Sequence, residues 1–401
     1  MVQDTKEINR ATVITELLRS RPTSRGQIAQ VTGISAATVS RAVDQLISEG
    51  LVREVSALVS ESRGRRPVLL DLEADTAHVV GVDLGASNTR FAIVDLLGST
   101  VVEREIRTPA DFSPAKLGEW VVAEVREAAG DMWNRIQFSS VGLPGAVSQD
   151  DGSVSNASNL AQVEDRRFLD ALESSFGIPV EIDNDVNYAL LGEQHFGVAS
   201  QYPTAAMLTL GAGLGAGLAI EGTILHGRRG LVGEFGHLPI GPLGTRLEHL
   251  VTGPGILRKA AEAGVTLADP AELFVSDPSN AITTLRGNFD HALLIVLTAI
   301  TVSCEPEIIV LGGGIAKSLA SSLTRYEDAL RQNLHSSPKL VLPGLGDMSG
   351  AVGAAVSGLH RAYRELGVSP DALTSLPVVT PSLVTRDQPA VMSAGLESVP
   401  S

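Results

Sequence analysis

The chain has 401 residues, which suits two or three domains, and its single cysteine, Cys304, excludes an internal disulfide framework and any metal site with several cysteine ligands. No apolar run reaches membrane-spanning length without Gly, Pro or polar residues, and residues 1–10 lack the apolar segment of a signal peptide, so that we expect a cytoplasmic, nucleoid-associated protein with no membrane partner. The net charge of −15 is unevenly distributed: residues 1–70 carry ten Lys/Arg and seven Asp/Glu, or +3, which leaves about −18 for the rest. Either only the first part of the chain approaches an anionic polymer, or the asymmetry is a chance property of a solvated surface.

The first 50 residues show helical periodicity in three blocks. In the first block the apolar residues at helical spacing are Ile8, Val13, Ile14, Leu17 and Leu18. Thr23 or Ser24 can cap a short second helix over residues 25–32, and Gly33 can supply a left-handed turn before a longer third helix. This pattern predicts a helix-turn-helix, with a generic three-helix bundle as the alternative.

The third helix has the composition of a DNA-recognition helix. Its small residues at 36 and 37 let the start of the helix approach a major groove, and its polar residues can project toward base edges and phosphates. The candidate DNA contacts in this helix are Ser35, Ala37, Thr38, Ser40 and Arg41.

Two predicted strands, residues 51–55 and 67–72, follow the third helix. The loop between them carries Arg63, Arg65 and Arg66, which fit the negative potential of a narrow minor groove. We therefore expect a winged helix-turn-helix domain over residues 1–74, with a flexible interdomain linker as the alternative interpretation of residues 51–72.

Polar residues follow two predicted strands of the next segment. A buried strand over residues 79–82 ends in Asp83 and a glycine turn, where backbone N–H groups can approach phosphate and the carboxylate can hold Mg²⁺ or a water. A second strand, within residues 178–183, ends at Asn184 and Asp185 and enters a helix. An Asp at the carboxyl end of a strand is where α/β proteins place reactive groups, although Asp185 can also serve only as a helix cap.

A glycine-rich stretch between residues 207 and 237 carries a recognisable spacing. A strand leads into Gly211, Gly213, Gly215 and Gly217, and the chain continues through Gly227 and Gly233 to Gly236-His237. This ordered spacing resembles the signature of the ROK family (repressors, open reading frames, kinases). Together with the first domain, it makes residues 5 to about 365 similar to ROK transcriptional regulators.

The resemblance implies an α/β fold in which the winged helix-turn-helix domain precedes a two-domain actin-like (hexokinase/ROK) ATPase fold. The first α/β domain would span residues 75–185 and be completed by about residues 350–365, and the second would span residues 186–349. We expect residues 366–401, which are rich in Pro and Ser, to form a loosely ordered tail.

The resemblance also implies a sugar site in the cleft of that fold. In ROK kinases a strand-end Asn-Asp pair, a Glu-x-Gly-His element and a Glu after the zinc loop bind sugar hydroxyls, and the Asp acts as general base. The matching residues here, with one from a sugar-side loop, are Asn159, Asn184, Asp185, Glu234, His237 and Glu248. Such side chains supply the fixed donors and acceptors that several hydroxyls require.

One departure from the family concerns zinc. Typical ROK proteins carry a loop with one His and three Cys after the Glu-x-Gly-His element, whereas the segment GPLGTRLE has no cysteine. Tetrahedral structural zinc needs four suitable ligands, and His237 with His249 do not supply them, so we expect no zinc. A neighbouring side chain or backbone carbonyl must then hold the His237 ring, or this wall of the site is more mobile than in zinc-bearing relatives.

The second departure concerns phosphate binding. The candidate nucleotide-site residues are Asp83, Gly85, Ser87, Gly211, Gly213 and Gly313. However, Ala86 stands where the kinases have glycine, and Ala212 stands where they have threonine, so that one residue crowds the backbone and the other lacks a hydroxyl donor. We expect weakened ATP binding.

The favoured interpretation is a sugar- or phosphosugar-responsive transcriptional repressor of carbohydrate metabolism, which binds operator DNA as a homodimer or a dimer of dimers and needs no cofactor. The alternative is a ROK sugar kinase with a regulatory DNA-binding domain, which would use Mg-ATP and Asp185 as general base to phosphorylate a hexose or N-acetylhexosamine. The helix-turn-helix favours the first, because dedicated ROK kinases lack it.

Overall fold

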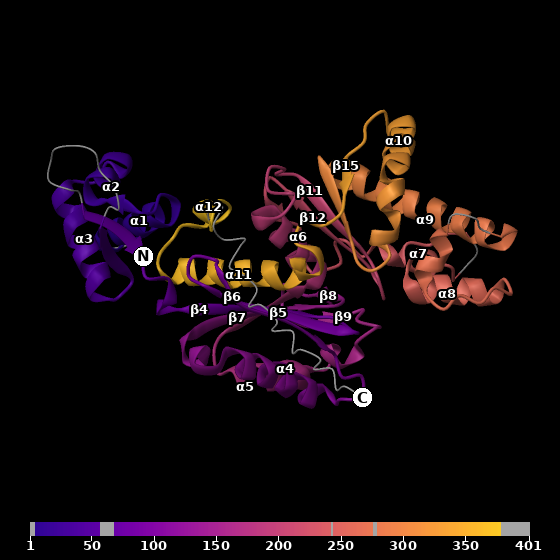
Figure 1. Ribbon diagram of the computed structural model, residues 1–401, viewed down its shortest axis with the longest axis horizontal. Helices are drawn as coiled ribbons and strands as arrows, with labels where there is room; N and C mark the ends of the chain where they lie inside the picture. The colour runs from indigo at the N-terminus through magenta and orange to yellow at the C-terminus, as the bar shows by residue number, and fades with distance from the viewer. Residues whose placement is uncertain (1–4, 57–67, 242–243, 276–278, 378–401) are drawn as a thin grey trace, which may run out of the picture.

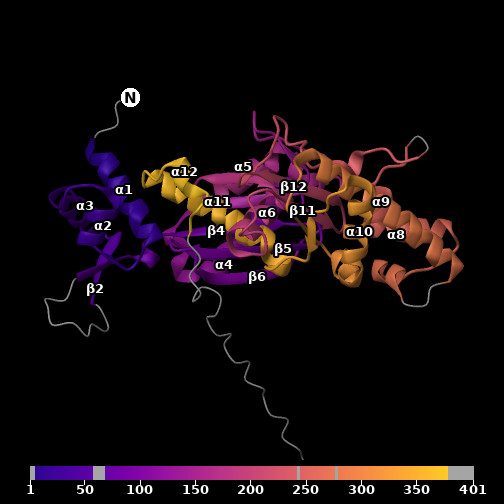
Figure 2. The same ribbon diagram turned by 90° about the horizontal axis from the view of Figure 1, so that it is seen from above.

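The protein consists of an N-terminal head and two α/β lobes, arranged in a row along the long axis of the molecule (Figure 1). The structure is a computed structural model that describes residues 5–56, 68–241, 244–275 and 279–377. The head lies at one end, and one central helix, α11 (Ser349–Glu365), runs from the head toward the middle of the body in both views (Figure 2).

The head has the predicted three helices and a small sheet with strand order β1-β3-β2. Its elements are α1 (Thr5–Arg19), β1 (Thr23–Ser24), α2 (Arg25–Thr32), α3 (Ala36–Ser48), β2 (Val52–Ser56) and β3 (Val68–Leu72). Ser24 caps α2 in a capping box with Gln27, and Gly33 ends it at φ 71°, a left-handed conformation that glycine adopts without strain. The side chain of Ser35 accepts a hydrogen bond from the N–H of Thr38 and so starts α3.

The first lobe contains a five-stranded sheet with strand order β10-β7-β4-β5-β6. Its strands are β4 (His78–Leu84), β5 (Asn88–Asp95), β6 (Thr100–Arg107), β7 (Ile136–Leu143) and β10 (Val180–Asn184). Helices α4 (Pro114–Ala129) and α5 (Arg166–Phe176) bury one face of this sheet, and α11 covers the other. Because β4, β7 and β10 are parallel, Asp83 and Asn184 emerge at the same edge of the sheet.

The second lobe contains another five-stranded sheet, with strand order β13-β12-β11-β14-β15. Its strands are β11 (Ala205–Leu210), β12 (Leu214–Ile220), β13 (Thr223–Ile224), β14 (Ile308–Gly312) and β15 (Lys339–Val341). Helix α6 (Asp185–Phe196) covers one face. The other face carries α7 (Glu248–Val251), α8 (Gly253–Glu262), α9 (Asn280–Cys304) and α10 (Leu323–Leu334).

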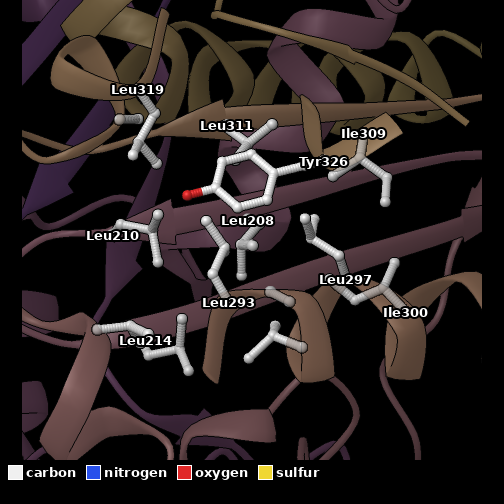
Figure 3. Packing of buried hydrophobic residues seen from close by; sticks show 14 of the residues in the cluster. Leu208, Leu210, Leu214, Leu293, Leu297, Ile300, Ile309, Leu311, Leu319 and Tyr326 are labelled. Atoms are coloured by element: carbon white, nitrogen blue, oxygen red, sulfur yellow. The ribbon is translucent and has the colours of Figure 1, made fainter. Parts of the chain in front are cut away.

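Leucines and isoleucines of β11, β14 and α9 interdigitate in the core of the second lobe, with Tyr326 of α10 among them (Figure 3). Helix α9 is long and apolar enough, by length and composition alone, to cross a membrane. One side of it is buried in this core, however, through Leu293, Leu297 and Ile300. An apolar core helix of this length passes the same test, so that it is weak evidence for a membrane span.

Shorter elements complete the chain. A two-stranded ribbon pairs β8 (Ala146–Val147) with β9 (Val154–Ser155). Within the described residues, the 3₁₀ helices are Ala74–Thr76, Gly130–Arg135, Ala161–Glu164, Phe235–His237, Pro270–Phe274, Ala316–Ser322 and Gly346–Met348, and the last helix is α12 (Pro370–Leu373).

Helices α6 and α11 pack against each other between the two sheets and so join the lobes. Their backbones approach so closely at Gly353 that a Cβ there would lie 1.7 Å from the carbonyl oxygen of Tyr188. The buried carboxylate of Glu193 in α6 accepts hydrogen bonds from the N–H groups of Gly344 and Leu345 and from the hydroxyl of Ser349, which fixes the start of α11. The junction between the lobes is therefore a close-packed helix pair.

The head and the first lobe share one hydrophobic core. Buried residues of α1 and α3 form a single cluster with residues of β4, β5 and α11. The Tyr363 hydroxyl of α11 donates a hydrogen bond of 2.7 Å to the carbonyl of Leu96, and Arg10 of α1 donates one of 3.3 Å to the carbonyl of Leu366. The orientation of the head is therefore tied to α11.

The sequence predicts a loosely ordered tail from residue 366 onward, but residues 366–377 are part of the folded structure. Within residues 366–377, the apolar side chains of Val368, Leu373 and Leu376 are buried in the core shared by the head and the first lobe. Nε2 of His360 donates a hydrogen bond of 2.7 Å to the Leu376 carbonyl. The apolar side chains of this segment have no regular spacing, and their contacts with the rest of the fold hold them in place. Residues 378–401 lie outside the described residues.

Candidate functional site

Four carboxyl groups from four separate elements interact electrostatically where the lobes meet. We call Asp83, Asp185, Glu234 and Glu248 the carboxylate cluster. Asp83 lies near the end of β4, Asp185 begins α6, Glu234 precedes the 3₁₀ helix Phe235–His237, and Glu248 begins α7. The fold thus gathers residues that are 165 positions apart in the sequence.

Three carboxyl groups of this cluster, those of Asp83, Asp185 and Glu234, have raised pKa values. Burial raises the pKa of the Asp185 carboxyl well above its ordinary value, and the negative charges of Asp83 and Glu234 raise it further. Burial also raises the pKa of Asp83, with Arg90 opposing the shift. The pKa of Glu234 is raised to about 7 by burial and by the charge of Glu248. A cluster of this kind favours ligands that donate hydrogen bonds, such as sugar hydroxyls, and can accept a proton near neutral pH.

Asn184 fixes the backbone that presents Asp185. Its side-chain oxygen caps α6 by accepting from the N–H groups of Val186 and Asn187, and its amide donates a hydrogen bond of 2.8 Å to the carbonyl of Gly145. The side-chain amide of Asn184 has two N–H donors, so the second one is available to a ligand. Asn184, which the family motif implies as a sugar ligand, thus also positions the backbone at Asp185.

Asp183, one residue earlier, was not singled out by the sequence pattern. It is buried, accepts a hydrogen bond of 3.0 Å from the Asn187 amide, and lies 2.7 Å from Nε2 of His226. This contact with Asp183 raises the pKa of His226. A histidine inside a glycine-rich loop was the one sequence signal that could have indicated the pair.

The same loop continues across to the first lobe. Arg228 forms an ion pair of 2.8 Å with Asp150, and its carbonyl accepts a hydrogen bond from the N–H of Gln149. His226 and Arg228 thus connect the second lobe to Asp183 of β10 and to the turn between β8 and β9. These contacts could not be predicted from a local pattern, because they join residues 43 and 78 positions apart.

Glu234, His237 and Glu248 lie close together, as their family motif implies. Nε2 of His237 is 3.6 Å from Oε2 of Glu234. A further residue joins them: Nη1 of Arg246 is 2.8 Å from Nδ1 of His237 and 3.9 Å from Oε1 of Glu248. His249 lies beside this group, with Nε2 3.8 Å from Oε1 of Glu248.

The glycine-rich hairpins that would face a nucleotide flank this site. Gly213 lies against Asn159, whose amide nitrogen would be 2.9 Å from a Cβ at that glycine, whereas a Cβ at Gly211 would meet nothing within 4 Å. Gly313, at φ 84°, packs against the carbonyl of Leu210. These three candidate nucleotide residues thus lie at the ends of strands β11 and β14 of the second lobe, and Asn159 of the sugar-side loop lies beside Gly213.

Two more of the expected nucleotide residues belong to the hairpin between β4 and β5. Gly85 donates its N–H to the Asn88 carbonyl in a tight turn, and Ser87 is exposed. The methyl group of Ala86 packs against the core of the first lobe. This alanine therefore has a packing partner in the position where the kinases have glycine.

The candidate DNA surface is the exposed side of α3. Ser35, Ala37 and Arg41 are exposed, Thr38 and Ser40 are half-buried, and Arg41 donates a hydrogen bond of 3.3 Å to the Thr38 hydroxyl. The opposite side of the helix is buried in the head. The other expected contacts, Arg63, Arg65 and Arg66, lie outside the described residues.

The fold defines a winged-helix head on a two-lobed α/β body, with acidic side chains gathered where the lobes meet. The chain belongs to the ROK family, because residues 79–359 match the ROK family model. Residues 7–59 match the model of the MarR family.

Individual relatives agree with this assignment. A putative xylose repressor of Caldicellulosiruptor sp. (strain Rt8B.4) is 33% identical over 238 residues, which are 59% of this chain and 59% of that protein. The chain thus matches about three fifths of the length of this relative. A ROK family transcriptional regulator, described as a homologue of the E. coli MLC protein, superposes with a TM-score of 0.72 at 21% identity over 92% of this chain and 99% of that chain.

A kinase is also similar to the body. The ROK hexokinase from Thermus thermophilus superposes with a TM-score of 0.59 at 28% identity, over 72% of this chain and 99% of that chain. Most of the chain thus shares the fold of a sugar kinase.

Proposed function

We propose that the protein is a sugar- or phosphosugar-responsive transcriptional repressor that binds operator DNA as a homodimer in the cytoplasm, at the nucleoid. The observation that carries the proposal is the position of α11. Its first residues lie against the carboxylate cluster, where a Cβ at Gly350 would be 2.8 Å from Cγ of Asp83, and its last residues lie in the core of the head. One helix thus connects the candidate ligand site with the DNA-binding module.

The composition of the site supports a sugar as the ligand. Asp185, Glu234, His237 and Glu248 offer carboxylate and imidazole groups to several hydroxyls at once. The similar protein from Caldicellulosiruptor is named as a putative xylose repressor, which makes D-xylose a reasonable first probe. Arg246, whose Nη1 lies 3.9 Å from Oε1 of Glu248, is a cation at this site that could receive a phosphate.

Regulation requires that the sugar prefers one arrangement of the lobes. A sugar held by residues of both lobes would favour their closed arrangement, and α6 and α11 would transmit the change because they pack at van der Waals distance. The head would follow α11, and the separation of the two heads in a dimer would change relative to paired operator half-sites.

An electrophoretic mobility shift with the DNA upstream of the protein's own coding region tests this function. The labelled DNA is titrated with protein, alone and with D-xylose, D-glucose, N-acetyl-D-glucosamine and their phosphates. We expect retardation that one of these ligands changes. Absence of retardation with any upstream fragment would contradict the proposal, and size-exclusion chromatography with light scattering checks the dimer.

A second candidate function, sugar phosphorylation with Mg-ATP, is favoured by one specific observation. The pKa of Asp185 is raised by burial and neighbouring carboxyl groups, which suits a general base at the beginning of a helix. A coupled assay for ADP release across hexoses and N-acetylhexosamines tests it. Turnover that Asp185→Asn abolishes would support this candidate, and no turnover with any sugar would exclude it.

A further inference from the structure

The zinc ion of typical ROK proteins does not fit the residues of this chain. The segment from residue 238 to 248, which follows the Glu-x-Gly-His element, contains no cysteine. Among the described residues, no group of three or more His, Cys, Asp or Glu side chains is placed to hold a metal ion. Nδ1 of His237, moreover, already has a partner, since Nη1 of Arg246 lies 2.8 Å away.

Backbone hydrogen bonds close this segment instead of metal ligands. Pro239 and Arg246 pair as an antiparallel bridge. On either side of it, the N–H of Leu247 donates to the Leu238 carbonyl, and the N–H of Ile240 donates to the Thr245 carbonyl, each at 3.0 Å. The short hairpin thereby returns the chain from His237 to Arg246 and Glu248, so that a cross-link by metal is not needed to hold the segment together.

The contact between Arg246 and His237 has a defined direction. A guanidinium can only donate hydrogen bonds, so Nδ1 of His237 must accept this one. The neutral ring then carries its hydrogen on Nε2, which lies 3.6 Å from Oε2 of Glu234 on the side of the carboxylate cluster. The geometry therefore selects one of the two tautomers of His237.

We propose that Arg246 takes the place of the zinc ion and acts as a positioning residue: it orients the His237 ring and holds it as an Nε2–H donor for a hydroxyl oxygen of the ligand. The assignment of a sugar as that ligand rests on the function proposed above. The selection of the tautomer does not, because it follows from the protein alone.

The surroundings of Arg246 suit this role. Its side chain is about half exposed, at 48%, and its other close carboxylate contact is the 3.9 Å approach to Glu248. Its backbone is fixed by the hairpin, and its N–H donates to Nδ1 of the neighbouring His249 at 3.3 Å. A side chain that is half exposed and lacks a tight carboxylate partner contributes little to the stability of the fold, so that its replacement tests the site rather than folding.

Nitrogen NMR of the full chain, labelled with ¹⁵N-histidine and free of sugar, tests the tautomer. His237→Gln assigns the signals of the ring. We expect Nε2–H in the parent and a mixture of tautomers in Arg246→Ala, with the parent pattern largely restored in Arg246→Lys, which still donates. Arg258→Ala, which removes a similarly exposed guanidinium on α8, should leave the pattern unchanged. An unaltered His237 pattern in Arg246→Ala would overturn the proposal.

Sugar titration by calorimetry provides the second measurement, with D-xylose, D-glucose and N-acetyl-D-glucosamine as the probes. For a sugar that binds the parent, we expect Arg246→Ala to weaken binding about tenfold, with the melting temperature unchanged. In a His237→Ala background the same change should have no further effect, because the residue acts through the ring. Equal weakening in both backgrounds would overturn the positioning role.

The two measurements separate this inference from the proposed function. If none of the sugars binds the parent protein, the sugar-response proposal fails while the NMR result still decides the role of Arg246 on the His237 ring. If a sugar binds and the tautomer does not depend on Arg246, the function stands and the inference fails. Zinc analysis of the purified protein accompanies both: a stoichiometric ion lost together with the Nε2–H signal on chelation would also overturn the inference.

Discussion

At the scale of single residues, the carboxylate cluster places acidic groups near one another with few cations among them. Burial and mutual repulsion disfavour the charged forms, so a ligand that donates hydrogen bonds to Asp185 and Glu234 replaces lost hydration. This arrangement costs stability in the free protein and contributes to ligand binding, which is common for sites that are assembled before the ligand arrives.

Glu234 allows this cost to be measured. Its pKa in the folded protein is about 7, above the ordinary value of 4.5, so its contribution to stability is fully present below pH 4.5 and is lost as the pH rises through 7. Glu234→Gln removes the charge that forms in this range. We expect the variant to melt about 2–5 °C above the parent at pH 8 and at the same temperature near pH 5, by differential scanning calorimetry. A difference that does not change with pH would contradict the raised pKa.

His237 is the second residue whose role can be separated from folding. His237→Ala should weaken binding of the responsive sugar about tenfold to a hundredfold, because a buried hydroxyl would lose its donor, while operator binding without sugar stays as in the parent. Mobility shifts with and without the sugar measure both. His291→Ala, at an exposed position of α9, is the matched control. A full sugar response in the His237 variant would remove this residue from the site.

Residues with a motif could be predicted from the sequence, and residues without one could not. Glu234, His237 and Glu248 lie within one short stretch, so their proximity follows from spacing. Asp183, His226 and Arg246 acquire their partners only when distant segments or the two ends of a hairpin meet. From the sequence, the His237 ring could be held by a side chain or by a backbone carbonyl, or it could be mobile. Only the structure shows that Arg246 holds it.

At the scale of elements, α11 carries much of the architecture. It touches the first sheet, α6 and the head, and it does so through small residues that let backbones approach. Gly353 meets α6 at Tyr188, and Gly81 of β4 lies where a Cβ would be 2.1 Å from the backbone nitrogen of Ala355. Glycine is unfavourable inside a helix, so the close packing against α6 is the physical reason for glycine at position 353.

Gly353→Ala tests that packing. The added methyl group overlaps the Tyr188 carbonyl, so α6 and α11 must separate, and we expect a loss of about 1–3 kcal/mol in the free energy of unfolding by urea titration. Gly287→Ala in α9 is the matched control, since its Cβ would meet nothing within 4 Å. That variant should be neutral or gain up to about 1 kcal/mol. Equal effects at both positions would show that the lobes are not held by the close approach.

Helix α3 provides the second prediction at this scale. Arg41 is exposed on the side of α3 that faces away from the core of the head. If it contacts operator DNA, Arg41→Ala should weaken binding and reduce the slope of log K against log salt concentration by about one, as the loss of one phosphate contact requires. Fluorescence anisotropy over a range of salt concentrations measures the slope. Arg331→Ala, on α10 in the second lobe, should change neither quantity.

The elements themselves were largely predictable. Helix caps at Ser24 and Ser35, the glycine at 33 and apolar periodicity place the three helices of the head, and the structure has them there. Residues 366–377 were not predictable in this way. Their buried side chains, such as Val368 and Leu376, have no regular spacing, and only contact with the head and α11 makes them part of a core.

At the scale of the whole molecule, the head packs directly against the first lobe. It is fused to the first lobe through a common core, and a small apolar cavity of about 10 Å³, lined by residues of α1, β3 and α11 among others, lies in the contact. Because close-packed contacts of this kind respond as units, movement of α11 should reorient the head as a body. The order of head and body could be predicted from the sequence. Their shared core could not, because its apolar residues in the head and in the first lobe fit equally well into two separate cores.

Tyr363 tests whether this contact transmits the sugar signal. It is fully buried in α11, and its hydroxyl donates to the Leu96 carbonyl. Tyr363→Phe keeps the ring in the shared core and removes the link between α11 and the turn after β5. We expect sugar affinity without DNA and operator affinity without sugar to stay near parent values, while the factor by which each ligand changes the affinity of the other falls toward one. Couplings of this kind are typically about 5–150-fold, and the factor must be the same whichever ligand is titrated.

The matched control for Tyr363 is another buried tyrosine outside the contact. Tyr326 of α10 lies in the core of the second lobe (Figure 3). Its hydroxyl donates a hydrogen bond to Asp290. Each of the two variants loses one buried hydrogen bond, so we expect Tyr326→Phe and Tyr363→Phe to lower the melting temperature by similar amounts. Tyr326→Phe should leave the coupling factor as in the parent. If both variants reduce the coupling equally, general loosening explains the effect. If neither does, the signal reaches the head by another route than the hydrogen bond that joins α11 to Leu96.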